Sequence, residues 1–281
     1  MPPRTIPTAR QGRLGVELRK LREAAGVVSR DAAEFLGTSQ AQISNIETGK
    51  NGVSEERVRR LAAIYACDNA QLVEALVEMT NERDKGWWEE CRGKVPPKAL
   101  DLAELEHHGT CLRTFQVVHI PGLLQTEEHI RAASSFAEPE LSEAVREEHI
   151  AFRLRRQQVL DAGRPYDAVI HEAALRLRVG GPRAARTQLE RILEESERES
   201  VTIRVIPFTA DDFAGAGQSL LYVGGKVTQL DTAQVDTGNG SLFVDAGAKL
   251  DRLRTRLVRI GSTALAPAPS LDLIRTIAQQ L

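Results

Sequence analysis

The sequence of 281 residues contains little cysteine and no long apolar run, and each absence narrows the class of protein. Its three cysteines, Cys67, Cys91 and Cys111, are far apart, so they have neither the paired spacing of a zinc site nor the density of a disulfide-rich domain. No stretch approaches the roughly 18 consecutive apolar residues of a membrane span. The first residues, MPPRTIPTARQGR, lack the apolar segment of a secretory signal. We therefore expect a cytoplasmic protein with free thiols and no membrane association.

Catalytic motifs are also missing. The dipeptide at 171–172, His-Glu, begins like the zinc helix of a metalloprotease, but Leu175 occupies the position of the second ligand. We interpret the pair as a histidine that ends a strand and a glutamate that starts a helix. Neither a GxSxG serine nor a glycine-rich phosphate loop is present. Three further histidines have no cysteine or carboxylate at ligand spacing: His107, His108 and His119. We expect no metal, no cofactor and no enzymatic activity.

The net charge of −2 hides an uneven distribution. Residues 1–66 contain 11 Lys and Arg against 7 Asp and Glu, a balance of +4, so the rest of the chain has −6. The chain is long enough for two domains, and its 42% hydrophobic residues are sufficient for buried cores. The basic N-terminal part is the candidate for contact with nucleic acid.

Periodicity and turn residues divide the chain into two domains and a linker. Residues 1–80 contain five helical patterns, at 10–25, 29–36, 39–48, 54–66 and 69–80, which predict an all-α domain. Residues 81–110 are polar and contain Pro96-Pro97, so we predict a linker with some helix on each side. Residues 111–281 alternate strand and helix patterns and predict an α+β domain. The expected strands are RTFQVVHI, YDAVIH, VTIRVIPF, SLLYVGG and KVTQL, and the expected helices are 141–160, 182–199, 246–260 and 270–281.

The stretch TSQAQISNIETGK, at 38–50, predicts a short helix with an unusual surface. Ile43 and Ile46 share one side with Glu47, and small polar residues and amides cover the other side. Such a surface suits the DNA major groove, where a Gln or Asn amide can bond bidentately to adenine. Lys50 and the amides at the helix N-terminus can reach phosphates. The alternative is a solvated surface helix. The preceding helix and its glycine turn favour DNA binding, because the pair forms a helix-turn-helix.

The run LRKLREAAGVVSRDAAEFLGTSQAQISNIETGK resembles the helix-turn-helix of the lambda-repressor-like XRE family of bacterial regulators. The resemblance implies a five-helix fold and an ion pair between Arg22 and Glu47 that orients the second helix; the alternative is a surface pair that contributes little. It also implies a homodimer on double-stranded DNA, because two half-sites about one DNA turn apart need two-fold symmetry. The residues that we predict to contact DNA are Ser29, Ser39, Gln40, Ala41, Gln42, Ser44, Asn45 and Lys50.

The segments GWWEEC, HIPGLLQTEEHIRA, IHEAALRLRVGG and VTIRVIPF resemble DUF5753, a domain that follows XRE domains in antitoxin-like actinobacterial regulators. The resemblance implies a transcriptional regulator and a small DUF397-type protein as its partner. An antitoxin that neutralises such a protein and regulates its own operon is the alternative.

Two further features lie outside the helix-turn-helix. Trp87 and Trp88 stand at the predicted domain junction, where they predict either domain docking or a ligand-facing wall, with docking favoured. The motif PGLLQT ends at Thr126 and predicts either a strand-to-helix connection capped by that threonine or a recognition loop.

Overall fold

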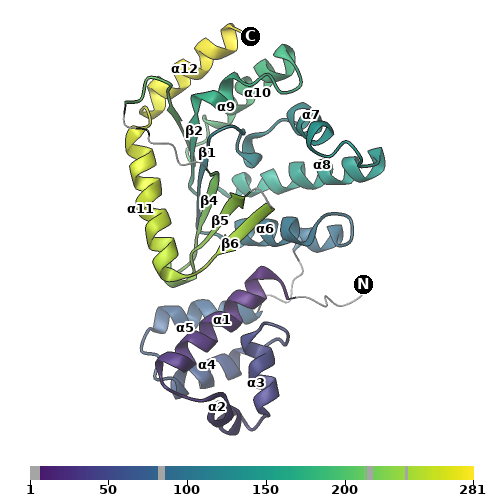
Figure 1. Ribbon diagram of the computed structural model, residues 1–281. Helices are drawn as coiled ribbons and strands as arrows, with labels where there is room; N and C mark the ends of the chain where they lie inside the picture. Colours follow the sequence, from purple (N-terminus) through teal and green to yellow (C-terminus); the bar gives the residue numbers. More distant parts are fainter. Residues whose placement is uncertain (1–6, 82–85, 212, 214–217, 238–239) are drawn as a thin grey trace.

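The structure, a computed structural model, describes residues 7–81, 86–211, 213, 218–237 and 240–281. An all-α domain at one end is joined to a larger domain built on one mixed sheet, which confirms the predicted all-α and α+β architecture (Figure 1). Among these residues, no helix is both long and apolar enough to span a bilayer.

The N-terminal domain consists of the five predicted helices. They are α1 Ala9–Ala24, α2 Ser29–Leu36, α3 Gln40–Glu47, α4 Glu55–Ile64 and α5 Ala70–Asn81. Side-chain caps fix several of their N-termini: Thr8 and Gln11 form a capping box at α1, and Ser54 accepts the Arg57 amide at α4. Their apolar faces form one core, whose most deeply buried members include Leu18, Ile43, Val58, Leu61 and Leu76.

The linker packs mainly on the larger domain. It contains the 3₁₀ helix η1 Trp87–Cys91 and helix α6 Pro97–His108. Trp88 is 3% exposed and shares a cluster with Leu100 and Phe152, and the Trp87 ring lies 5.2 Å from that of Phe152. The two tryptophans therefore join the linker to helix α8 of the larger domain, Glu143–Gln157. The predicted docking of the two domains on each other depends on other residues, described below.

The larger domain has one six-stranded sheet in the order β3-β2-β1-β4-β5-β6. The first three strands are parallel, and β4, β5 and β6 are antiparallel to their neighbours. Residues of β2 alternate between the faces, and both faces are covered near it, so four of its six side chains are buried. The strands are β1 Cys111–Gln116, β2 Tyr166–His171, β3 Val201–Ile206, β4 Leu220–Gly224, β5 Thr232–Thr237 and β6 Gly240–Val244.

Helices cover the two faces of the sheet unequally (Figure 1). On one face, Leu112 and Ile203 pack with Leu189, Ile192 and Ile274 from helices α10 and α12. The other face carries helix α11 Gly247–Thr263 and a second apolar cluster. The remaining bounds are η2 Gly122–Leu124, α7 Glu127–Ala137, α8 Glu143–Gln157, η3 Gln158–Ala162, α9 Glu172–Arg176, α10 Pro182–Glu195, η4 Thr228–Leu230 and α12 Pro267–Gln279.

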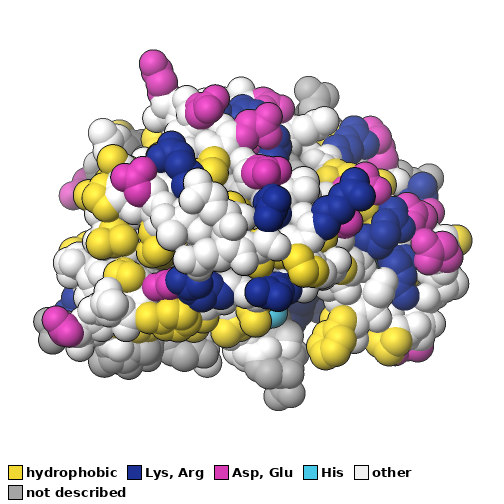
Figure 2. All heavy atoms as spheres, turned by 90° about the horizontal axis from the view of Figure 1, so that it is seen from above, with side chains coloured by type: hydrophobic (Ala, Val, Ile, Leu, Met, Phe, Trp, Pro, Cys, Tyr) yellow, Lys and Arg dark blue, Asp and Glu magenta, His cyan; other side chains and the backbone are white. Residues whose placement is uncertain are grey.

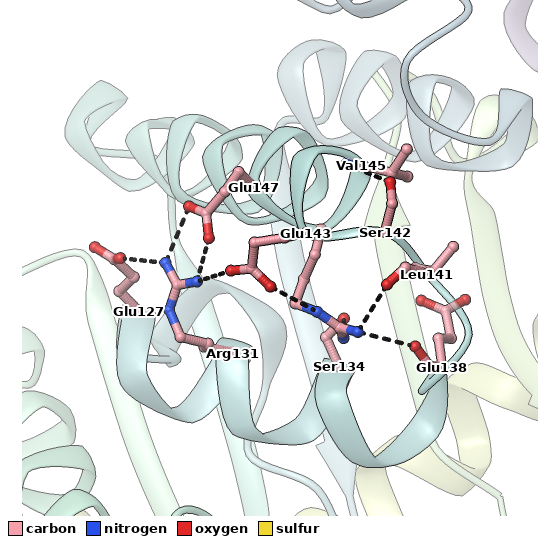
Figure 3. A network of polar contacts seen from close by, with 10 residues as sticks. Glu127, Arg131, Ser134, Glu138, Leu141, Ser142, Glu143, Val145 and Glu147 are labelled. Carbon is pink, nitrogen blue, oxygen red and sulfur yellow. Dashed lines mark hydrogen bonds and ion pairs between the residues drawn. The ribbon is translucent and has the colours of Figure 1, made fainter.

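An ion-pair network joins α7 to α8 (Figure 3). The Arg131 guanidinium bonds Glu127 of its own helix at 3.0 Å and reaches across to Glu143 and Glu147 of α8. These bonds raise the pKa of Arg131 and lower that of Glu147. Arg146 donates back to Ser134 of α7 at 3.2 Å, so the helical hairpin is fixed from both sides.

Two interpretations of local motifs are confirmed. His171 ends β2 and its Nδ1 accepts the Ala173 amide at 3.2 Å, while Glu172 is the first residue of α9. Thr126 caps α7 by accepting the His129 amide at 3.2 Å, as expected for a strand-to-helix connection.

One predicted strand is wrong, and two strands were missed. KVTQL, at 226–230, contains the 3₁₀ helix η4, because Val227 and Leu230 pack against the core of the other domain instead of joining the sheet. The strand begins later, at Thr232, and β6 follows it. Both were missed because TAQVDT and GSLFV contain too many polar and small residues for a clear apolar alternation.

Candidate nucleic-acid interface

The turn between α2 and α3 sets the start of the predicted DNA-contacting helix. Gly37 ends α2 in the left-handed conformation, with φ of 61°, which glycine adopts without strain. Two residues later, the Ser39 hydroxyl accepts the Gln42 amide at 3.2 Å and caps α3. Ser39 is exposed at the N-terminus of α3, and its hydroxyl oxygen already accepts the capping hydrogen bond.

The buried side of α3 packs directly against α1. Ile43 and Ile46 are 1% and 2% exposed. Gly15 of α1 lies under the end of α3, where an added Cβ would come within 2.5 Å of the Ile46 carbonyl oxygen. A glycine is therefore required for the two helices to approach this closely, and it fixes the tilt of α3 relative to α1.

The predicted pair between Arg22 and Glu47 is present and bidentate. Arg22 Nε lies 2.6 Å from Glu47 Oε1, and Arg22 Nη2 lies 3.0 Å from Glu47 Oε2. A third bond joins Arg22 Nη1 to the Val27 carbonyl at 2.9 Å. The side chains of Arg22 and Glu47 are 12% and 9% exposed, so the pair is not on the open surface, and its contribution to stability stays a prediction. The bond to Glu47 raises the pKa of Arg22, and burial, aided by the Glu47 charge, raises the pKa of Tyr65 to about 12.

The opposite side of α3 is open and polar. Gln40, Ala41 and Ser44 are exposed, and Asn45 is half-buried. Gln40 Nε2 donates to Ser29 Oγ at 3.0 Å, which connects two of the predicted contact residues across the turn. An amide nitrogen carries two hydrogens, so Gln40 can keep this bond and still offer one hydrogen and its oxygen to adenine.

Asn51, which the sequence analysis did not single out, extends this polar surface. Its Nδ2 donates to Gln42 Oε1 at 2.9 Å and fixes the orientation of that amide. The signal was available, since Asn51 directly follows Lys50 in the turn after α3. Lys50 itself is exposed, as a phosphate contact requires.

The helix-turn-helix domain is docked on the larger domain through α1 and α5. Arg13 of α1 is 7% exposed; it donates to the Gln229 carbonyl and lies 3.5 Å from Thr232 Oγ1 and 3.9 Å from Asp245. Lys226 pairs with Glu78 of α5, and the Ala9 amide donates to Asp101 of α6 at 3.2 Å. Val227 and Leu230 add apolar contact with the core of the small domain. The orientation of α1 therefore depends on the segment between β4 and β5.

A cavity of about 420 Å³ lies at this junction. Its wall combines the first turn of α1 with α5, α6 and the end of the sheet next to the helix-turn-helix domain. The wall includes Arg10, Asp101, His108, Arg164 and Phe243. Burial lowers the pKa of His108 to about 3, so its imidazole is neutral at pH 7. The cavity is within the size range of small-molecule sites, which often lie between domains.

Among the described residues, no three His, Cys, Asp or Glu side chains converge as a set that could hold a metal ion.

Helix α3 is the second helix of a helix-turn-helix. A glycine and a buried ion pair hold it against α1, and its outward side chains are amides and hydroxyls. These features define a DNA-binding helix-turn-helix protein of the class that regulates transcription. The comparisons agree: a family described as a helix-turn-helix domain matches residues 13–76. A second family, described as a domain of unknown function (DUF5753), matches residues 99–276, and the chain belongs to it. No curated protein and no solved structure matched the chain.

Proposed function

We propose that the protein is a homodimeric, XRE-type transcriptional regulator that binds a specific operator through α3, and that its larger domain controls this binding in response to a partner protein or ligand. It acts by binding and not by catalysis.

The exposed side of α3 carries the proposal. Gln40 is held by Ser29, and Gln42 is held by Asn51, so two amides are oriented before DNA arrives. Preorganised amides lose less side-chain entropy on binding, and each bidentate pair with a base discriminates by about 1–3 kcal/mol. A merely solvated helix has no need for such fixed amides.

Control by the larger domain follows from how α1 is held. Arg13 bonds the larger domain, and Gly15, two residues further on, supports α3. In a dimer, a change in how the larger domain holds α1 alters the spacing between two copies of α3. A partner shifts this arrangement only if it binds one arrangement more tightly than the other.

The test is selection of bound fragments from sheared genomic DNA at fixed, near-physiological salt, because phosphate contacts otherwise dominate the affinity. Wild-type protein is compared with Gln40→Ala/Asn45→Ala. The matched control, Gln71→Ala/Gln279→Ala, removes two exposed amides from α5 and α12. We expect the wild type and the control to enrich one two-fold-related site and the α3 variant to lose it. Equal enrichment by all three proteins would refute sequence recognition by α3.

A second experiment separates the regulator from an antitoxin that mainly neutralises a small DUF397-type protein. A main role as an antitoxin predicts co-purification of a stoichiometric small protein that is toxic alone. Titration of that protein into the operator complex then tests control: unchanged DNA affinity would contradict the proposed coupling.

A further inference from the structure

Strand β6 is an open edge of the sheet. Within the described part of the chain, it pairs only with β5, through the register from Ala233–Val244 to Thr237–Gly240. At the β3 edge, Ser270 Oγ accepts the Val205 amide and the Leu265 amide donates to the Val205 carbonyl. At the β6 edge, the exposed Lys98 of α6 donates to the Ser241 carbonyl at 2.8 Å, and an added strand would displace this side chain from that acceptor. An open edge presents backbone donors and acceptors to another chain, and proteins normally protect such edges.

Leu242 adds an exposed apolar side chain to this open edge. Leu242 is 56% exposed. It is opposite Val235 in the ladder, so it lies on the sheet face that packs against α11. An apolar side chain at an open edge favours addition of a further strand.

Helix α11 carries a row of basic side chains beside that face. Lys249, Arg252, Arg256 and Arg259 each precede a residue that packs toward the sheet, namely Leu250, Leu253, Leu257 and Ile260. At 3.6 residues per turn, the four cations fall within an arc of about 80° and extend over about 15 Å. We call them the basic row. In the part of the chain that the structure describes, none of these four side chains forms an ion pair or hydrogen bond, whereas Arg254 on another side of the helix pairs with Asp251.

Helical geometry places the basic row on the flank of α11 away from β3, and therefore on the β6 side of the sheet. The opposite flank is marked by Gly261, whose carbonyl accepts from Arg204 of β3, the strand at the far edge of the sheet. Two residues, Asp245 and Ala246, separate the end of β6 from the start of α11. In Figure 1, β6 is the strand in the foreground and α11 runs along one face of the sheet. The basic row contains cations alone, whereas the end of the larger domain farthest from α1–α5 has acidic and basic side chains next to each other (Figure 2).

We infer that β6 accepts an extended acidic segment of another protein as a seventh strand, with the acidic side chains of that segment on the basic row. The inference rests on the proposed control by a partner, whose chemistry it names. Backbone bonds to β6 supply affinity, and alternate side chains facing α11 supply specificity. Pairing of β6 with β6 of a second copy is disfavoured, because it would bring two basic rows together.

The probe is a fluorescein-labelled decapeptide of alternating Glu and Val, with alternating Lys and Val as its charge control, measured by fluorescence anisotropy with the full chain at fixed salt. We expect the acidic peptide to bind and the basic one not to bind. Arg252→Glu/Arg256→Glu should weaken binding at least tenfold. The control Arg183→Glu/Arg186→Glu makes the same charge change on exposed residues of α10 and should leave binding within twofold.

Strand addition is tested separately from charge. An extended peptide directs the amides of its Glu residues to one edge and those of its Val residues to the other. N-methylation of one set or the other therefore blocks one edge at unchanged charge. We expect one isomer to bind like the parent peptide and the other at least tenfold more weakly.

Several outcomes would overturn the inference: no peptide binding, equal binding by both N-methyl isomers, or equal loss in the α10 control. A 20-base-pair duplex that binds the basic row while the peptide does not would assign the row to nucleic acid. A dimer dissociated by Leu242→Lys would assign the edge to a second copy. Genomic selection is scored independently, so loss of peptide binding with intact operator binding refutes this inference alone.

Discussion

Removal of Arg22 tests whether the buried ion pair holds α3 in place. Arg22→Met keeps much of the side-chain volume but leaves the Glu47 carboxylate, 9% exposed, without its bidentate partner. Breaking a buried pair by removing one partner costs about 3–5 kcal/mol. Because both side chains keep some exposure, we expect the lower end, about 3 kcal/mol. Arg22→Met/Glu47→Met should cost less than the sum of the two single substitutions, since no buried charge remains.

The assay uses the position of the tryptophans. Both, Trp87 and Trp88, lie outside α1–α5, so their fluorescence follows the larger domain while far-UV circular dichroism also follows the helices of the small one. In urea, Arg22→Met should lower the midpoint of the circular dichroism transition and shift the fluorescence transition less. Operator affinity should fall with it.

The control is Arg19→Met on the same helix. Arg19 pairs with Glu23 at 2.7 Å, but the two side chains are 59% and 51% exposed, so we expect no measurable change. Equal effects of Arg22→Met and Arg19→Met would refute the reasoning, as would strict additivity in the cycle with Glu47.

Three further predictions concern packing, pH and coupling. Gly15→Ala should destabilise the small domain by about 2 kcal/mol and weaken operator binding, because its Cβ meets the Ile46 carbonyl at 2.5 Å; Gly12→Ala, with no atom within 4 Å, should do neither, as circular dichroism melts can show. Burial, with help from Arg153, lowers the pKa of His129 to about 4, so the unfolded chain binds its proton first and stability is lost as pH falls from about 6.5 toward 4. Between pH 7 and pH 5 the contribution of His129 to this loss should be about 2 kcal/mol, so His129→Gln should change the pH dependence of the free energy of unfolding by that amount in urea titrations where His149→Gln does not. Asp245→Asn should leave acidic-peptide affinity within twofold but reduce the change in operator affinity that the peptide causes.

The all-α domain was predictable because its signals are local. Gly37, Ser39 and Ser54 mark helix ends, and Ile43 and Ile46 fall at helical spacing, so each helix is specified within its own few residues. The residues that set the position of α3 were only partly accessible. The pairing of Arg22 with Glu47 came from the family resemblance, whereas the need for Gly15 depends on a backbone approach between α1 and α3 that no pattern shows.

The larger domain was less predictable where its residues serve the other domain. Val227 and Leu230 are the apolar residues of the predicted strand KVTQL, but they are half-buried against α1–α5, and a one-dimensional pattern cannot tell a sheet neighbour from a docked domain. The same holds for β6. Its glycine, serine and exposed Leu242 give a weak strand signal, because an edge strand has fewer neighbours to satisfy.

The open edge and the DNA-contacting helix are joined by a short physical route. Asp245 directly follows β6 and lies 3.9 Å from Arg13, which is buried where α1 meets the larger domain. Two residues further along α1, Gly15 contacts the backbone at the end of α3. A strand added to β6 would act on Asp245, and a weakened hold on Arg13 would let α1 rotate with α3 attached. Proximity alone does not establish coupling. Asp245→Asn therefore tests whether the β6 edge and α3 are coupled, because it interrupts the route between them while leaving both binding surfaces intact.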